Sequence, residues 1–97
     1  MDIHVEAPNH ANYTQLDQHY RTTLSTRYEP FEFIKTVQVK VKKENDTSIV
    51  KLLIDMERDP IAFVEASDIS EEKAFKVAMQ KMDKVVRKYK SKHYHGI

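Results

Sequence analysis

Hydrophobic and polar residues alternate over the first six positions of the chain. Ile3 and Val5 fall on one side, and Asp2, His4 and Glu6 fall on the other. A period of two is typical of a strand that buries one face. The chain is therefore expected to begin with a short, half-buried strand.

The period then changes to that of a helix. Pro8-Asn9 interrupts the strand, and Asn12 with Gln15 three residues later has the spacing of a helix cap. Pro30 predicts the end of the helix, because the residue before a proline disfavours helical geometry. Large apolar residues recur between them at steps of three and four, which predicts one buried side: Tyr13, Leu16, Tyr20, Leu24 and Tyr28.

Three alternating segments follow, at residues 34–42, 50–57 and 61–66. Each predicts a half-buried strand. The turn signals Glu44-Asn45-Asp46 and Asp59-Pro60 separate them. Connections this short join antiparallel neighbours, so the three strands should form a meander.

The last segment, about Ser70 to Lys92, predicts a long amphipathic helix. Either Asp68, with Glu71 at its third position, or Ser70 can cap it. Its apolar positions fall within an arc of roughly 120° and predict a core face: Phe75, Ala78, Met79, Met82, Val85, Val86 and Tyr89. The order β-α-β-β-β-α indicates an α+β two-layer sandwich, with both helices on one face of a four-stranded sheet, as in double-stranded RNA-binding domains.

The composition narrows the class of protein. Ninety-seven residues suffice for one domain. No apolar run approaches the ~20 residues of a membrane span, and the first residues lack the basic and apolar regions of a secretory signal. The chain has no cysteine, which excludes disulfides and thiolate chemistry. A cytoplasmic protein is expected.

Charge is distributed unevenly. Residues 1–69 hold 8 Lys and Arg against 12 Asp and Glu, whereas residues 70–97 hold 8 against 3. On the last helix, four lysines fall within an arc of roughly 80° that is separate from the apolar face: Lys81, Lys84, Lys88 and Lys92. We call this row the basic stripe; Lys73 lies at its edge, and Lys76 and Arg87 flank it.

Three interpretations of the basic stripe remain open at this point. A solvated helix would normally interleave acids with lysines, but Asp83 is the one acid after Glu72. An unbalanced row suits phosphate neutralisation, so we favour binding to nucleic acid. An acidic protein partner is the second interpretation. A row of bases that merely complements the helix dipole near its C-terminus is the third.

Signals for chemistry are weak. His93 and His95 match no closed metal site and lie where chains are often mobile. The alternating carboxylates Asp55, Glu57 and Asp59 are typical of the solvent side of a sheet. The chain has one glycine, so a glycine-rich phosphate loop is excluded. We expect no enzyme, no cofactor and no metal, and the core spacing of the aromatic residues favours recognition of RNA backbone and shape.

The chain resembles the short ribosome hibernation-promoting factors, a family that includes ribosome-associated inhibitor A and the sigma-54 modulation proteins. The similarity covers nearly the whole chain. It includes the alternating strand at residues 34–42 and is closest at Met82-Asp83-Lys84-Val85-Val86-Arg87, which is similar to the family's apolar-Asp-Lys-Leu-x-Arg segment.

The resemblance implies binding to the small ribosomal subunit, with basic helices against 16S rRNA in the channel for mRNA and tRNA, and inhibition of translation in stress or stationary phase. It implies a ribosome-binding domain at 1–92, a short flexible tail at 93–97 and a monomer off the ribosome. The expected RNA-binding residues are those of the last helix and two arginines of the first: Lys81, Lys84, Arg87, Lys88, Lys92, then Lys73, Lys76, Lys90, and finally Arg21 and Arg27.

The chain departs from the family pattern in two places. The family's Asp-Met/Leu-Tyr signature before the last helix is partial or displaced, because Asp68-Ile69-Ser70 is followed by Glu71-Glu72-Lys73-Ala74-Phe75. Thr23 and Thr26 stand where family members carry lysines on the first helix. The last helix is therefore expected to carry most of the contact.

Overall fold

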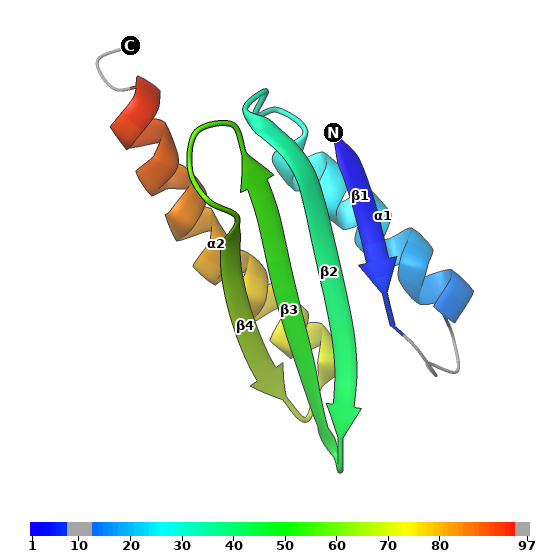
Figure 1. Cartoon of the computed structure of the whole chain (residues 1–97). Coiled ribbons are helices and arrows are strands. Elements are labelled where there is room, and N and C mark those ends of the chain that lie inside the picture. The colour runs from blue at the N-terminus through cyan, green and yellow to red at the C-terminus, as the bar shows by residue number, and fades with distance from the viewer. Residues whose placement is uncertain (8–12, 95–97) are drawn as a thin grey trace.

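The computed structural model describes residues 1–7 and 13–94, except for the side chain of residue 13. Strands β1 (Asp2–Glu6), β2 (Ile34–Glu44), β3 (Thr47–Met56) and β4 (Ala62–Asp68) form one sheet, and helices α1 (Tyr13–Tyr28) and α2 (Glu71–Tyr94) lie together behind it (Figure 1). The predicted α+β sandwich and its element order are confirmed. The break at Pro8-Asn9, the cap at Asn12 and the core position of the Tyr13 side chain lie outside the described residues.

The sheet is mixed, with the strand order β1-β2-β3-β4. Strands β2, β3 and β4 are antiparallel neighbours, which confirms the meander. β1 runs parallel to β2, with Ile3 opposite Val37, because α1 carries the chain back to the start of the next strand. The mixed sheet therefore has β1 and β4 as its two edges.

A tight turn and a bulge set the register of β2. Glu44 pairs with Thr47 across a two-residue turn, in which Asn45 has φ 55°. Asparagine adopts this left-handed conformation at less cost than most residues. At the other end, a register shift between Ile34 and Thr36 lets Ile34 and Val37 both face the core although they are three positions apart.

The core lies between the sheet and the two helices. Apolar residues at alternate positions of the strands, such as Val39, Leu52 and Ile54, are fully buried. The helices meet mainly through side chains: the rings of Tyr20 on α1 and Phe75 on α2 lie 4.2 Å apart between centroids. Sequence periodicity therefore predicted the buried side of both helices.

Some element boundaries differ from those predicted. β3 begins at Thr47 rather than at residue 50, because the tight turn lets the pairing extend to the hairpin end, and β4 covers Ala62–Asp68 rather than 61–66. α2 continues to Tyr94, so His93 and Tyr94 belong to the helix rather than to the expected tail. Contacts explain the extension: His93 lies 3.0 Å from Asp59, and the Tyr94 ring stacks 5.4 Å from that of Phe33.

Candidate nucleic-acid interface

Helix α2 supports most of the candidate binding residues, and two hydrogen bonds fix its start. Ser70 Oγ accepts a hydrogen bond from the Lys73 backbone N–H (3.3 Å), and Asp68 Oδ1 accepts one from the Ser70 N–H (2.8 Å). Ser70 is thus the helix cap, and Asp68 orders the turn before it. The core face, from Ala74 to Tyr89, then fixes which side of α2 remains in solvent.

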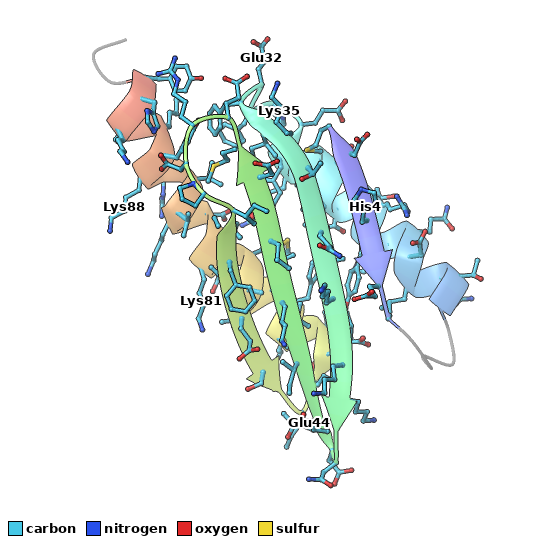
Figure 2. All side chains as sticks on the ribbon, in the orientation of Figure 1. His4, Glu32, Lys35, Glu44, Lys81 and Lys88 are labelled. Atoms are coloured by element: carbon cyan, nitrogen blue, oxygen red, sulfur yellow. The ribbon has the colours of Figure 1, made fainter. Side chains whose placement is uncertain are left out.

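The basic stripe lies on the side of α2 next to edge strand β4. Figure 2 shows Lys81 and Lys88 leaving the helix on this side, beyond β4. All four lysines are exposed. The structure therefore places the four together, as the sequence predicted.

The members of the basic stripe differ in their contacts. Lys81 Nζ donates to the backbone carbonyl of Glu65 (2.8 Å), and Lys92 Nζ lies 3.4 Å from Asp59 Oδ1. Lys84 and Lys88 form no ion pair with any residue that the structure describes. The centre of the stripe therefore has two uncompensated charges, while its ends are partly occupied.

The stripe is also interrupted on its N-terminal side. Val77 lies four residues before Lys81 and four after Lys73, so it occupies the position where the row would continue, and it is 40 % exposed. Lys73 is thereby separated from the other lysines by an apolar step. The spacing of four between Lys73, Val77 and Lys81 is the sequence signal of this interruption.

The opposite side of α2 faces α1. Lys76, Asp83 and Lys90 follow one another at seven-residue steps, and Arg87 lies one turn after Asp83. Lys76, Arg87 and Lys90 are exposed, and none of them is ion-paired within the described residues. The candidate residues of α2 thus form two rows, and Arg87 lies between them, three residues and about 60° of helix rotation from Lys84.

Asp83 connects the two helices. Arg27 Nε donates to Asp83 Oδ1 (3.0 Å), Arg27 Nη2 donates to Oδ2, and the Tyr28 hydroxyl donates to Oδ1 (3.0 Å). Partial burial raises the pKa of Asp83, but the hydrogen bonds from Arg27 and Tyr28 outweigh burial, and the pKa is below its ordinary value. Asp83 therefore stays ionised and holds Arg27 against α2.

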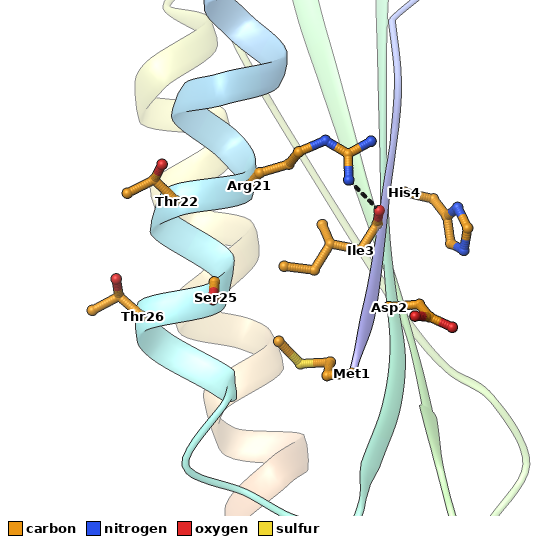
Figure 3. Close-up of a pocket in the computed structure, with 8 residues that line it drawn as sticks. All are labelled: Met1, Asp2, Ile3, His4, Arg21, Thr22, Ser25 and Thr26. Atoms are coloured by element: carbon orange, nitrogen blue, oxygen red, sulfur yellow. Dashed lines mark hydrogen bonds between the residues drawn. The ribbon is translucent and has the colours of Figure 1, made fainter.

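Arg21 also has partners within the chain, although its side chain is exposed. Its Nε donates to Asp17 Oδ2 (2.8 Å), and its Nη1 donates to the backbone carbonyl of Ile3 (2.5 Å). Figure 3 shows Arg21 reaching from α1 to edge strand β1, across a hollow of about 660 Å³, while Thr22 and Thr26 point away from the strand. The two candidate arginines of α1 are thus not presented with the lysines of α2.

The weaker signals for chemistry are dispersed. Asp55 lies on the open face of the sheet opposite Thr36, Glu57 pairs with Lys35 (3.3 Å), and Asp59 contacts Lys92 and His93. Among residues 1–7 and 13–94, no three His, Asp or Glu side chains are grouped so as to hold a metal ion. His95 lies outside the described residues. In the same ranges, neither helix is long and apolar enough to cross a membrane.

Residues 3–94 match the protein family described as "Sigma 54 modulation protein / S30EA ribosomal protein". The chain belongs to this family. Membership confirms the resemblance stated from the sequence and the expectation that the protein acts by binding rather than as an enzyme. A search of curated proteins gave no match.

Two solved structures share the fold of this S30EA family member. A ribosomal subunit interface protein from Coxiella burnetii superposes with a TM-score of 0.80 at 17% identity, over 94% of this chain and 99% of that one. The N-terminal domain of Protein Y from Thermus thermophilus gives 0.76 at 15% identity, over 92% and 99%. At such identities the likeness shows the fold and does not locate the contact residues.

Proposed function

We propose that this protein is a hibernation factor that binds the small ribosomal subunit through 16S rRNA, in the channel for mRNA and tRNA, and blocks translation in stress or stationary phase. Residues 1–92 act as one binding domain, in the cytoplasm, as a monomer off the ribosome. Family membership supports association with the ribosome. The Coxiella burnetii protein of similar fold is described as a ribosomal subunit interface protein, which supports the same partner.

The observation that carries the proposal is the pair of uncompensated lysines at the centre of the basic stripe. Lys84 and Lys88 lie on consecutive turns of a rigid helix and form no ion pair among the described residues. When lysines such as these neutralise backbone phosphates, the counterions of the phosphates are released, and this release favours binding. The nearby aromatic residue Tyr89 is only 2 % exposed, so recognition depends on charge and shape rather than on stacking by its ring.

The contacts rank the candidate residues. Lys84, Arg87 and Lys88 are the primary phosphate ligands in this proposal. Those of intermediate rank are partly engaged elsewhere or lie farther along α2: Lys73, Lys76, Lys81, Lys90 and Lys92. Arg21 and Arg27 rank last because their guanidinium groups already donate hydrogen bonds within the protein. Arg21 donates to Asp17 and to the Ile3 carbonyl, and Arg27 donates to Asp83.

Cosedimentation with purified small subunits tests the proposal. A variant with Lys84, Arg87 and Lys88 replaced by alanine should bind more weakly, and each lost phosphate contact should lower the slope of log affinity against log salt by about 0.9 or less. The matched control replaces Lys42, Lys43 and Lys51 on β2 and β3, which removes the same charge away from the helices.

Wild-type affinity of the α2 triple variant would contradict the proposal, as would equal losses in the two triple variants. Nuclease treatment separates RNA from protein partners. Association that survives complete digestion of the rRNA would favour an acidic protein partner instead.

A further inference from the structure

A cleft of about 430 Å³ lies between the β3–β4 loop (residues 57–61) and the last turns of α2. Its walls are largely apolar, and its polar groups are few. This volume is within the range of ligand pockets, about 300–1,000 Å³. The lining residues are Met56, Asp59, Pro60, Ala62, Val85, Lys88, Tyr89 and Lys92.

Specific contacts fix the position of the β3–β4 loop relative to helix α2. The Arg58 backbone N–H donates to the Tyr89 hydroxyl (2.9 Å), and the Arg58 guanidinium lies 5.5 Å from the centroid of the Tyr94 ring. Asp59 lies 3.0 Å from the His93 ring and 3.4 Å from Lys92. Arg58 and Asp59, in the first part of the loop, are therefore held against the last turns of α2.

The two sides of the cleft differ in charge. Lys88, which has no ion pair within the described residues, lies on the helix side and continues the basic stripe from Lys84. The loop side has Asp59, whose pKa is lowered by its contacts with His93 and then with Lys92, so that it stays ionised. A ligand with an anionic end toward Lys88 and a hydrogen-bond donor toward Asp59 fits this arrangement.

We propose that the cleft binds one unpaired nucleotide of an RNA strand, with its base between Pro60, Ala62 and Val85 and its phosphate on Lys84 and Lys88. The faces of a nucleobase are flat and apolar, and they match the largely apolar walls of the cleft. Adenine carries an exocyclic amino group that can donate a hydrogen bond to the Asp59 carboxylate, whereas uracil has no such group. The cleft would add a contact with a base to a surface that otherwise recognises RNA backbone.

The inference rests on the proposed RNA-binding function, but binding of short oligonucleotides tests it separately. Fluorescence anisotropy of the wild-type protein should show tighter binding of oligoadenylate than of an abasic strand of equal length, by about tenfold for one buried base. Oligouridylate should fall between them. Equal affinity for oligoadenylate and the abasic strand would overturn the inference without any variant.

Ala62→Leu fills the cleft and leaves every charge in place. It should reduce binding of oligoadenylate to the level of the abasic strand, whereas Ser67→Leu, which adds bulk at an exposed position of the same strand, should not. Lys88→Gln should weaken binding of all three strands. Circular dichroism verifies the fold of each variant, and an Ala62→Leu protein that is folded and binds oligoadenylate normally would refute the site.

Two further measurements distinguish a failure of the RNA assignment from a failure of the base contact. If adenosine monophosphate binds as tightly as the oligomer and Ala62→Leu abolishes this binding, the cleft holds a free nucleotide and the assignment to RNA is wrong. Cosedimentation of the wild-type protein with small subunits, alongside a cleft that does not distinguish bases, would leave the proposed function in place and overturn the base contact alone.

Discussion

Asp83 is the one acidic side chain among the cations in the second half of α2, and its contacts explain its presence. Arg27 and Tyr28 both donate to it, and Arg87 stands one turn away on the same helix. Without a carboxylate here, Arg27 and Tyr28 would lose a hydrogen-bond acceptor, and the positive charges of Arg27 and Arg87 would repel each other. Asp83 thus orients α1 relative to the cationic surface of α2.

Replacing Asp83 with asparagine should lower the free energy of unfolding by about 1–2 kcal/mol, a value reduced for the partial solvent exposure of the pair. Asparagine keeps the shape but loses the charge that holds Arg27. Urea unfolding measures the change. Asp55→Asn, on the open face of the sheet, is the matched control and should alter stability by less than about 0.5 kcal/mol; equal effects at both sites would contradict this role for Asp83.

Residue-scale contacts were the part of the structure least accessible from the sequence. The basic stripe was predicted because its members repeat along one helix. The pairing of Arg27 with Asp83 joins positions on different helices, and no periodicity relates them. For the same reason the internal contacts of Arg21 and Lys81 were not predicted, although both residues were recognised as cations.

At the scale of elements, both edges of the sheet are touched by a cation from the helix beneath. Arg21 on α1 donates to the Ile3 carbonyl of β1, and Lys81 on α2 donates to the Glu65 carbonyl of β4. Edge strands offer backbone groups on which another chain can form a further strand, and charged side chains are a common protection. Phe63, which is 55 % exposed on β4, makes that edge the more vulnerable.

The double variant Arg21→Ala/Lys81→Ala should therefore self-associate more than the wild-type protein as its concentration rises. Sedimentation velocity would show the change as an increase in weight-average sedimentation coefficient. Lys76→Ala/Lys90→Ala loses the same charge from α2 without altering an edge contact. Equal self-association in the two variants would show that net charge, rather than edge protection, keeps the chains apart.

Element order was predictable because each element has its own period, but two placements were not. The parallel pairing of β1 depends on the path of α1, which a local pattern does not encode. The bulge at Lys35 shifts the alternation so that Ile34 faces the core, whereas strict alternation from Val37 would place Lys35 there. Both features arise from tertiary packing.

The whole molecule is elongated, with extents of 45 × 21 × 19 Å. Its open sheet face pairs most of its charges, as in Lys40 with Glu6 (3.8 Å) and Lys51 with Glu65 (3.8 Å). The α2 side does not, and from Lys73 to Lys92 it extends about 28 Å along the helix. Charge is therefore separated between the two faces, which suits a protein that lies with one side against a polyanion.

The parallel strand β1 has a consequence for the time course of folding. β1 leaves the exit tunnel before its partner strand β2, which follows only after the whole of α1. The β2–β3 hairpin is closed by a two-residue turn, so it can form without any distant segment, and local pairing of this kind forms in microseconds. We expect pulse-labelling hydrogen exchange during refolding to protect amides of β2 and β3 before those of β1; simultaneous protection would contradict this order. β1 would then reach its native place after the hairpin that is synthesised later.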